Sequence, residues 1–487
     1  MVGAQGGPGW GRGTVPPIHF GTSGWRGILA EDFTFARARI VTAAIARYVK
    51  ESGLAARGVV VGYDTRFLSE AFAREAAASL ATSGLRVYLC VRDTPTPALA
   101  AEILERGAAG GVNITASHNP PEYNGMKFSM ASGGPALPEV TAAIEAEANR
   151  LLQGPPLPPA ALAGHPAAEI TPTDPYPPYA ARVLGLLDLA CLRRAHLKVV
   201  VDPLYGTGRG YLDTLCREAG CEVSVIHDYR DPLFGGGTPE PSAENLTALA
   251  RAVRERGAHL GLATDGDADR FGLLDTDGTF VEPNYLLGLL LDYLAGTRGW
   301  SGGVARSVAT THLVDAAARR RGVPVYETPV GFKYIGDLLT QGKILLGGEE
   351  SAGLTVKGHV PEKDGILACL LAAELVAASG GRSLGALLQD LYRAVGTVLC
   401  RRVNLPLSPA GEDRLKAVLA NPPTTLGGRR VLQVNQVDGV KLLLEDGSWV
   451  LLRPSGTEPM VRLYVEAASR ERLDALETAG RSLLDGQ

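Results

Sequence analysis

We predict an α/β protein built of three similar α/β domains, with mixed, largely parallel sheets, and a smaller C-terminal α+β domain. Its 487 residues are too many for one ordinary domain. Short β-rich runs alternate with helical patterns through most of the chain, which is typical of α/β units around parallel strands. Near the C-terminus this alternation gives way to strands in quick succession and a final helix, which indicates an α+β domain.

The first α/β series begins with a buried-strand pattern at Gly58–Tyr63. A helix is expected near Glu70–Ser83, followed by a second strand at Arg86–Val91. Pro and Ala then dominate Gln153–Pro178, so we expect this segment to connect two domains.

Two further series repeat this order of strand and helix. The second opens with a strand at Lys198–Asp202, a helix near Gly210–Ala219 and a strand at Glu222–His227. The third begins with strands at Gly303–Val308 and Pro324–Glu327. The repetition predicts that each series forms its own largely parallel sheet.

The C-terminal part has strand patterns at Val431–Val434, Val440–Leu444 and Trp449–Arg453, with Asp446-Gly447 as a hairpin signal. A helix is expected at Arg470–Leu484. The predicted organisation is a disordered N-terminus at 1–18, followed by domains at 19–155, 176–297, 298–395 and 396–487.

Composition excludes several classes of function. A formal charge of −4 and a pI near 6.1 predict no nucleic-acid partner, and no apolar run is long enough for a membrane span. The Gly/Pro-rich N-terminus lacks the apolar segment of a secretory signal. The six cysteines are scattered without zinc or CxxC spacing, so we expect reduced thiols in a cytoplasmic protein.

The most informative motif is Thr-Ala-Ser-His-Asn-Pro at residues 115–120. Ser117 follows a short apolar run and precedes His118 and an Asn-Pro turn, so its hydroxyl is expected at a loop tip. Such a hydroxyl could be attacked or could carry a group. The alternative is a polar turn that happens to contain Ser and His.

A second motif places Asp265, Asp267 and Asp269 at alternate positions, followed by Arg270. Three carboxylates between small residues make an oxygen cage suited to Mg²⁺. An EF-hand loop is excluded, since it needs Gly and Glu where the chain has Arg270 and Thr276. Arg270 beside the cage indicates a nearby phosphate, which Arg grips with two hydrogen bonds.

Two Gly-containing segments could bind phosphate and sugar. Arg453–Pro459 offers backbone N–H groups, hydroxyls and Arg453 for a phosphate nest, to which Arg462 could add a second guanidinium. Gly347–Gly353 carries paired carboxylates and a serine that suit the hydroxyls of a sugar ring. Weaker candidates lie in Thr328–Lys333 and at His359 and Lys363. Together these motifs favour phosphoryl transfer, and the absence of a P-loop pattern argues against an NTP-driven kinase of that type.

With these motifs the chain resembles the α-D-phosphohexomutases, a phosphoglucomutase/phosphomannomutase-like family whose members interconvert sugar 1-phosphates and 6-phosphates. The resemblance runs from about Phe20 to the C-terminus. It rests on six motifs in the order found in the family: GTSGWRG, TASHNP, DGDADR, TPVGFK, GEESAG and RPSGTEP.

The resemblance implies four domains around a central cleft, with Ser117 as a phosphoserine that binds Mg²⁺ together with Asp265, Asp267 and Asp269. Arg26 and Arg270 would steady the phosphoserine, while His118 and Lys127 are candidates for acid/base work. The implied substrate contacts are Thr328, Gly331, Lys333, Glu349 and Ser351 for the sugar, and Arg453, Ser455, Gly456, Thr457 and Arg462 for the distant phosphate. Glucose 1,6-bisphosphate is the expected intermediate and activator. Sugar phosphates are the expected binding partners. The protein itself is expected to be a monomer or a homodimer.

The fourth motif bears on the choice of sugar. The family often has a histidine where this chain has Gly353, so we hypothesise that Lys363 or His359 supplies the missing cation. The motif favours a phosphoglucomutase, with mannose phosphates as further substrates. A phosphoglucosamine mutase is the alternative, and a non-catalytic sugar-bisphosphate sensor is the alternative from another class.

Overall fold

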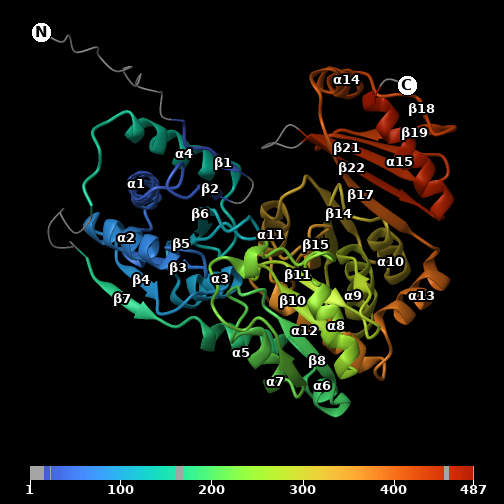
Figure 1. Cartoon of the computed structure of the whole chain (residues 1–487), viewed down its shortest axis with the longest axis horizontal. Helices are drawn as coiled ribbons and strands as arrows, with labels where there is room; N and C mark the ends of the chain where they lie inside the picture. The colour runs from blue at the N-terminus through green and yellow to red at the C-terminus, as the bar shows by residue number, and fades with distance from the viewer. Residues whose placement is uncertain (1–15, 22–23, 160–167, 455–459, 486–487) are drawn as a thin grey trace, which may run out of the picture.

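The computed structural model describes residues 16–21, 24–159, 168–454 and 460–485. Over these residues the strands form three sheets that contain parallel pairs and a C-terminal sheet that is antiparallel throughout. This confirms the predicted fold class. Figure 1 shows the C-terminal sheet, in red, as a separate lobe above the third α/β domain. Among the described residues, no helix combines the length and apolar character that a membrane span requires.

The N-terminal sheet has the order β1-β2-β6-β5-β3-β4-β7. Its strands and helices are β1 (Phe20–Gly21), β2 (Gly24–Ile28), α1 (Phe35–Glu51), β3 (Val59–Tyr63), α2 (Ser69–Thr82), β4 (Val87–Cys90), α3 (Thr96–Arg106), β5 (Gly110–Ile114), β6 (Tyr123–Met130), α4 (Pro138–Leu152) and β7 (Ile170–Thr173). Strands β3, β4, β5 and β7 run parallel, and β6 is antiparallel to β5.

The segment expected as a connection between domains therefore contributes an edge strand. Residues 170–173 form β7, which pairs with β4 although Pro172 lacks an N–H group. Proline is tolerated there because the outer side of an edge strand needs no donor. The same segment then enters helix α5 (Tyr176–Leu186).

The second sheet has the order β12-β11-β10-β8-β9 and the third has β14-β13-β15-β16. The second domain contains α5, α6 (Leu189–Ala195), β8 (Lys198–Asp202), α7 (Leu212–Glu218), β9 (Glu222–Val225), α8 (Thr247–Arg256), β10 (Leu260–Thr264), β11 (Phe271–Leu274) and β12 (Phe280–Val281). The third contains α9 (Pro283–Thr297), β13 (Gly303–Ser307), α10 (Leu313–Arg321), β14 (Val325–Thr328), α11 (Phe332–Thr340), β15 (Ile344–Glu349), β16 (Gly353–Val356), α12 (Gly365–Ala378) and α13 (Leu384–Val395).

These two domains share one hydrophobic core, which runs through α12. Residues 365–377 of this helix are all buried and, apart from Glu374, carry no charged or polar side chain except the Cys369 thiol, so the helix is not amphipathic. It packs against α6, β10 and β11 of the second domain and against α9 and β16 of the third. The loops at the ends of β10 and β15 are therefore held in place by the same hydrophobic core.

The C-terminal sheet has the order β17-β22-β21-β20-β19-β18. Its elements are β17 (Leu399–Pro406), α14 (Pro409–Ala420), β18 (Thr425–Leu426), β19 (Arg429–Asn435), β20 (Val440–Leu444), β21 (Trp449–Pro454), β22 (Met460–Ala467) and α15 (Arg470–Asp485). The predicted hairpin lies between β20 and β21, where Gly447 has φ +79°. This domain has a core of its own.

Candidate active site

Ser117 lies in the loop after β5, where its side chain is buried. Its Oγ donates to Oδ2 of Asp265 at 2.7 Å and lies 3.2 Å from Nδ1 of His118. Its φ of +55° is uncommon for a residue with a side chain, and a hydrogen bond from its N–H to Oγ1 of Thr115 at 2.8 Å holds this turn. The predicted reactive hydroxyl therefore faces the aspartates rather than open solvent.

Arg66, which the sequence reasoning missed, holds the serine loop in place. Its buried guanidinium donates to the carbonyl oxygens of Ser117 and Asn119 at 2.7 and 2.6 Å. It also donates to those of Pro120 and Tyr123, and it pairs with Asp64 at 3.1 Å. One side chain thus satisfies carbonyls that a tight loop would otherwise leave buried without partners. An Asp-Thr-Arg triplet directly after a buried strand was the available signal.

The three aspartates lie in the loop between β10 and β11 and are buried. Their ligand oxygens all lie within 4.8 Å of one another, the arrangement that a metal ion needs. Oδ1 of Asp267 and Oδ1 of Asp269 are buried and have no hydrogen-bond partner among the described residues. Orphaned carboxylate oxygens that converge in this way fit a hard divalent cation such as Mg²⁺.

Two lysines balance the negative charge of these aspartates. Nζ of Lys127 lies 2.6 Å from Asp267 and 2.9 Å from Asp269, and Nζ of Lys363 lies 3.0 Å from Asp269. Burial raises the pKa of Asp265 well above its usual value, and the charges of Asp269 and Asp267 add to the effect. Burial opposes ionisation of Asp269 as well, but the two ammonium groups outweigh it and lower its pKa.

Two arginines lie near the serine loop and near each other. Arg26, on β2, donates to Oδ1 of Asn119, and Arg270 approaches Glu240 at 3.5 Å. Burial lowers the pKa of Arg26, and the charge of Arg270 lowers it further. Burial likewise lowers the pKa of His118 well below its usual value, with Arg270 and Arg26 as the next causes. Such mutually repelling cations favour the binding of an anion among them.

The sugar-loop candidates lie on the hairpin between β15 and β16, where Glu349 pairs with Gly353 across the strands. Oε1 of Glu349 accepts a hydrogen bond from the N–H of Gly331 at 2.8 Å, and Gly331, with φ +132°, precedes α11. Thr328 ends strand β14 of the same sheet, from which β13 separates the hairpin. The structure thereby brings the motifs at 328–333 and 347–353 together, with Ser351 at the hairpin tip.

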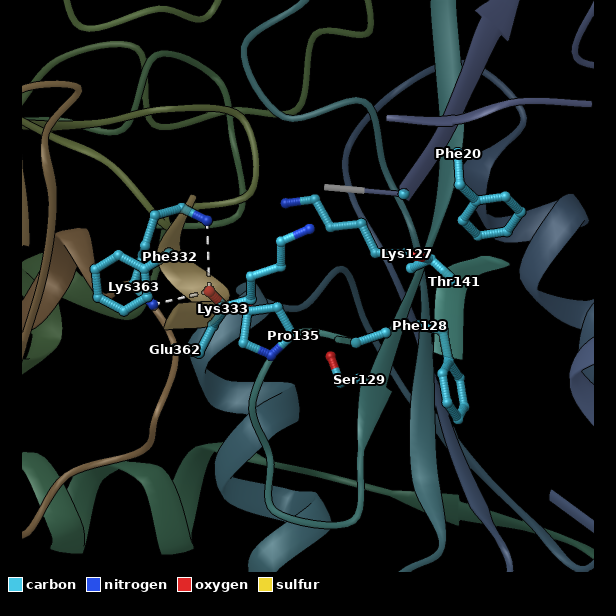
Figure 2. A pocket seen from close by; sticks show the side chains of 12 residues that line it. Phe20, Lys127, Phe128, Ser129, Pro135, Thr141, Phe332, Lys333, Glu362 and Lys363 are labelled. Atoms are coloured by element: carbon cyan, nitrogen blue, oxygen red, sulfur yellow. Dashed lines mark hydrogen bonds and ion pairs between the residues drawn. The ribbon is translucent and has the colours of Figure 1, made fainter. Parts of the chain in front are cut away.

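Figure 2 shows the ammonium groups of Lys127, Lys333 and Lys363 directed towards the same space. This space lies between the first and third domains and is also lined by Phe20, Phe128, Pro135 and Glu362. Partial burial lowers the pKa of Lys333. A concentration of three lysines beside the aspartates favours an anionic ligand here.

The two proposed stand-ins for the family histidine differ in their surroundings. Nε2 of His359 lies 2.7 Å from Asp364, whose carboxylate also accepts from Tyr179 and caps α12, so His359 belongs to the core. A Cβ atom at Gly353 would lie 2.5 Å from Cδ of Lys363. The stem of Lys363 thus fills the space of a side chain at position 353, which favours Lys363.

We expect Lys363→Met to lower turnover of sugar phosphates by about 10²-fold, because a buried cation beside the reacting groups is lost. His359→Gln is the matched comparison. It removes a buried partner of Asp364, so we expect it to lower the free energy of unfolding by about 1–3 kcal/mol while each folded molecule keeps its turnover. Steady-state kinetics and urea unfolding measure the two effects. Equal losses of turnover in both variants would contradict this assignment.

The candidate phosphate nest is described in part. Arg453 on β21 and Arg462 on β22 are direct cross-strand partners, and Nε of Arg453 donates to Asp438 at 2.8 Å. Nε of Arg462 is buried without a hydrogen-bond partner among the described residues. Like charges placed opposite each other on adjacent strands are unfavourable unless an anion lies between them. Ser455, Gly456 and Thr457 lie outside the described residues.

Comparison with family models places four consecutive segments of the chain in one family. The models are described as phosphoglucomutase/phosphomannomutase alpha/beta/alpha domain I at residues 17–154, domain II at 177–278, domain III at 282–395 and the C-terminal domain at 406–480. The order of the models along the chain is that of the sheets in the structure.

Full-length relatives point the same way. The chain is 32% identical to a phosphoglucomutase/phosphomannomutase of Thermococcus kodakarensis, with 96% of this chain and 98% of that protein aligned. It is also 32% identical to a probable phosphoglucosamine mutase of Methanothermobacter thermautotrophicus, over 96% and 98% of the two chains. A crystal structure from Thermus thermophilus, assigned as a phosphomannomutase, is 36% identical, covers 97% of this chain and 100% of its own, and has a TM-score of 0.83.

Proposed function

Because the chain belongs to the phosphoglucomutase/phosphomannomutase family of α-D-phosphohexomutases, we propose that it interconverts glucose 1-phosphate and glucose 6-phosphate through a phosphoserine. It is an isomerase of the phosphohexomutase class. The observation that carries the residue assignment is the 2.7 Å hydrogen bond between Ser117 and Asp265. That bond joins the serine of the first domain to the aspartate cage of the second.

In the proposed reaction phospho-Ser117 gives its phosphoryl group to the 6-hydroxyl of glucose 1-phosphate. Arg26 and Arg270 hold the transferring group by charge, as their approach to the serine loop supports. Asp265, Asp267 and Asp269 would hold Mg²⁺, which neutralises charge on the transferring phosphoryl group. Lys127 and His118, both beside the reacting groups, are the candidates to move the proton of the attacking hydroxyl.

The resulting glucose 1,6-bisphosphate then reorients within the site, so that its 1-phosphate faces Ser117 and is returned to it. Arg453 and Arg462, with the adjacent segment 455–457, would hold the phosphate that is not reacting in either orientation. Glu349 and Ser351 would form hydrogen bonds with hydroxyl groups of the sugar. Thr328, Gly331 and Lys333, on the loop that Glu349 contacts, would bind the sugar as well. Added bisphosphate is expected to activate the enzyme, because it rephosphorylates a serine that has lost its phosphate.

The identity of the sugar is the finer part of the proposal. Glucose is favoured by Glu-Glu-Ser in the fourth motif and by Lys363, whose stem fills the space beside Gly353. Mannose phosphates are expected as further substrates. Phosphoglucosamine mutase is a second candidate, since relatives of equal identity include proteins assigned to that activity.

We expect intact-protein mass to rise by one phosphoryl group after incubation with glucose 1,6-bisphosphate and Mg²⁺. Peptide mapping should place the group on Ser117. With the phosphorylated protein, glucose 1-phosphate should then give the highest kcat/KM in a panel with mannose and glucosamine 1-phosphates. If glucosamine 1-phosphate gave the highest kcat/KM, the proposed assignment to glucose would be wrong and the protein would be a phosphoglucosamine mutase. A chain that is never phosphorylated and turns over none of the three would instead be a sugar-bisphosphate sensor.

A further inference from the structure

The tip of the β15–β16 hairpin carries three polar or charged residues in a row, and they do not face the same way. Glu349 accepts from Gly331 within the third domain, as described above. The next carboxylate, Glu350, lies against the C-terminal domain instead. Its Oε1 accepts a hydrogen bond from the hydroxyl of Tyr464 at 3.0 Å, and its Oε2 lies 3.5 Å from the guanidinium of Arg402.

We propose that Glu350 is a positioning residue that ties the C-terminal domain to the sugar-reading hairpin. Its contacts with Arg402 and Tyr464 are called the Glu350 bridge here. The bridge makes the placement of Glu349 and Ser351 depend on the docking of the domain that carries Arg453 and Arg462. This inference rests on the proposed function, in which those two pairs grip opposite ends of one sugar phosphate.

The C-terminal sheet presents the two partners of Glu350 as a unit. Arg402 on β17 and Tyr464 on β22 are direct cross-strand neighbours, so both side chains leave the same face of the sheet. Tyr464 is buried against Val308, Ala309 and Trp449. Burial raises the pKa of Tyr464, and the charge of Glu350 adds to the effect, so the phenol stays a hydrogen-bond donor.

The hairpin tip is fixed to other parts of the site as well. The N–H of Glu350 donates to Oγ1 of Thr310 at 3.2 Å. The carbonyl oxygen of Ala352 accepts from the N–H of Phe271, which directly follows the aspartate loop, at 3.4 Å. Ala352 has φ +68°, a left-handed conformation that is unfavourable for a residue with a side chain. A tip strained in this way is expected to relax when one of its ties is lost.

The bridge also borders a cleft between the third domain and the C-terminal domain. This cleft of about 430 Å³ lies next to Glu350 and is lined by Glu282, Asn284, Cys400, Arg402 and Tyr464. When the C-terminal domain moves away, the Glu350 carboxylate loses both partners, and a largely buried charge without partners is unfavourable. The bridge therefore favours the docked position.

The test is a double-mutant cycle with Glu350→Gln, Arg402→Gln and the double variant, together with Tyr464→Phe, which keeps the ring and its packing. Each single change is expected to raise KM for glucose 1-phosphate about 5- to 10-fold with little change in kcat, and the double variant no more than one of them. Hydrogen exchange of the backbone at residues 349–356 should become faster in Arg402→Gln, although the change lies in another domain.

Arg401→Gln is the matched control. Arg401 is the neighbour of Arg402 on β17, but it pairs with Asp474 and Glu477 inside the C-terminal domain. It should leave both KM and exchange at the hairpin as in the unmodified chain. Unchanged exchange at 349–356 in Arg402→Gln would overturn the Glu350 bridge, as would strictly additive effects on KM. If the unmodified chain turns over no sugar phosphate, the proposed function fails, and the exchange comparison alone decides on the bridge.

Discussion

Ser117→Ala is expected to reduce mutase activity by a factor on the order of 10³ or more, because the group that carries the phosphoryl moiety is removed. The buried hydroxyl is the one that contacts Asp265, and alanine keeps the size of the loop residue. A coupled assay for glucose 6-phosphate measures the loss. Intact mass after incubation with glucose 1,6-bisphosphate should show no gain of a phosphoryl group.

Ser83→Ala provides the control for this variant. Ser83 follows α2, far along the chain from the aspartate loop, and its hydroxyl donates to the carbonyl oxygen of Ser79. Its variant should be phosphorylated and active as the unmodified chain is. Phosphorylation of the Ser117→Ala variant to the same extent would show that another residue carries the group, and the assignment of Ser117 would be wrong.

Asp267→Asn is expected to reduce activity by about 10²-fold or more and to remove the response of the protein to Mg²⁺. Asp267 contributes an orphaned oxygen to the cage, and it is also the carboxylate closest to Lys127. Ligands that bind the folded state raise its stability, so Mg²⁺ should raise the melting temperature of the unmodified chain. The same titration should leave that of Asp267→Asn nearly constant.

Asp277→Asn is the matched control for the metal experiment. Asp277 lies in an exposed turn of the same domain, where its carboxylate accepts from the N–H of Thr279. It should keep both the activity and the Mg²⁺-dependent shift. An equal shift in Asp267→Asn and in the unmodified chain would show that Asp267 is not a metal ligand and would place the metal elsewhere.

The local features of the fold were predictable because they rest on short-range patterns. The run Val59–Val61 is buried on both faces of its sheet, and Asp446-Gly447 forms the expected hairpin. The strand β7 was not predicted, because Pro172 and its proline-rich surroundings hide a short edge strand in a segment that reads as a linker. Its pairing with β4 is decided by tertiary contacts.

In the site, motif spacing indicated Ser117 and the three aspartates, which the structure brings into contact. Arg66 could not be predicted in its role, since it binds carbonyl oxygens that lie more than fifty residues further along the chain. The orientation of the Glu350 side chain could not be predicted either. Two adjacent glutamates in a hairpin turn cannot be assigned different contacts from the sequence. Only the packing of the C-terminal domain against the turn decides which carboxylate faces it.

The helix α12, buried on all sides, has a consequence for how the molecule opens. Because it completes the core of two domains at once, separating those domains would expose apolar surface that neither can cover alone. The C-terminal domain has a core of its own and, among the described residues, shares only a small apolar cluster with Val308 and Ala309 of the third domain. Undocking the C-terminal domain therefore exposes less apolar surface than separating the second and third domains, so we expect the aspartate cage and the sugar hairpin to stay together as one cooperative unit if the C-terminal domain moves.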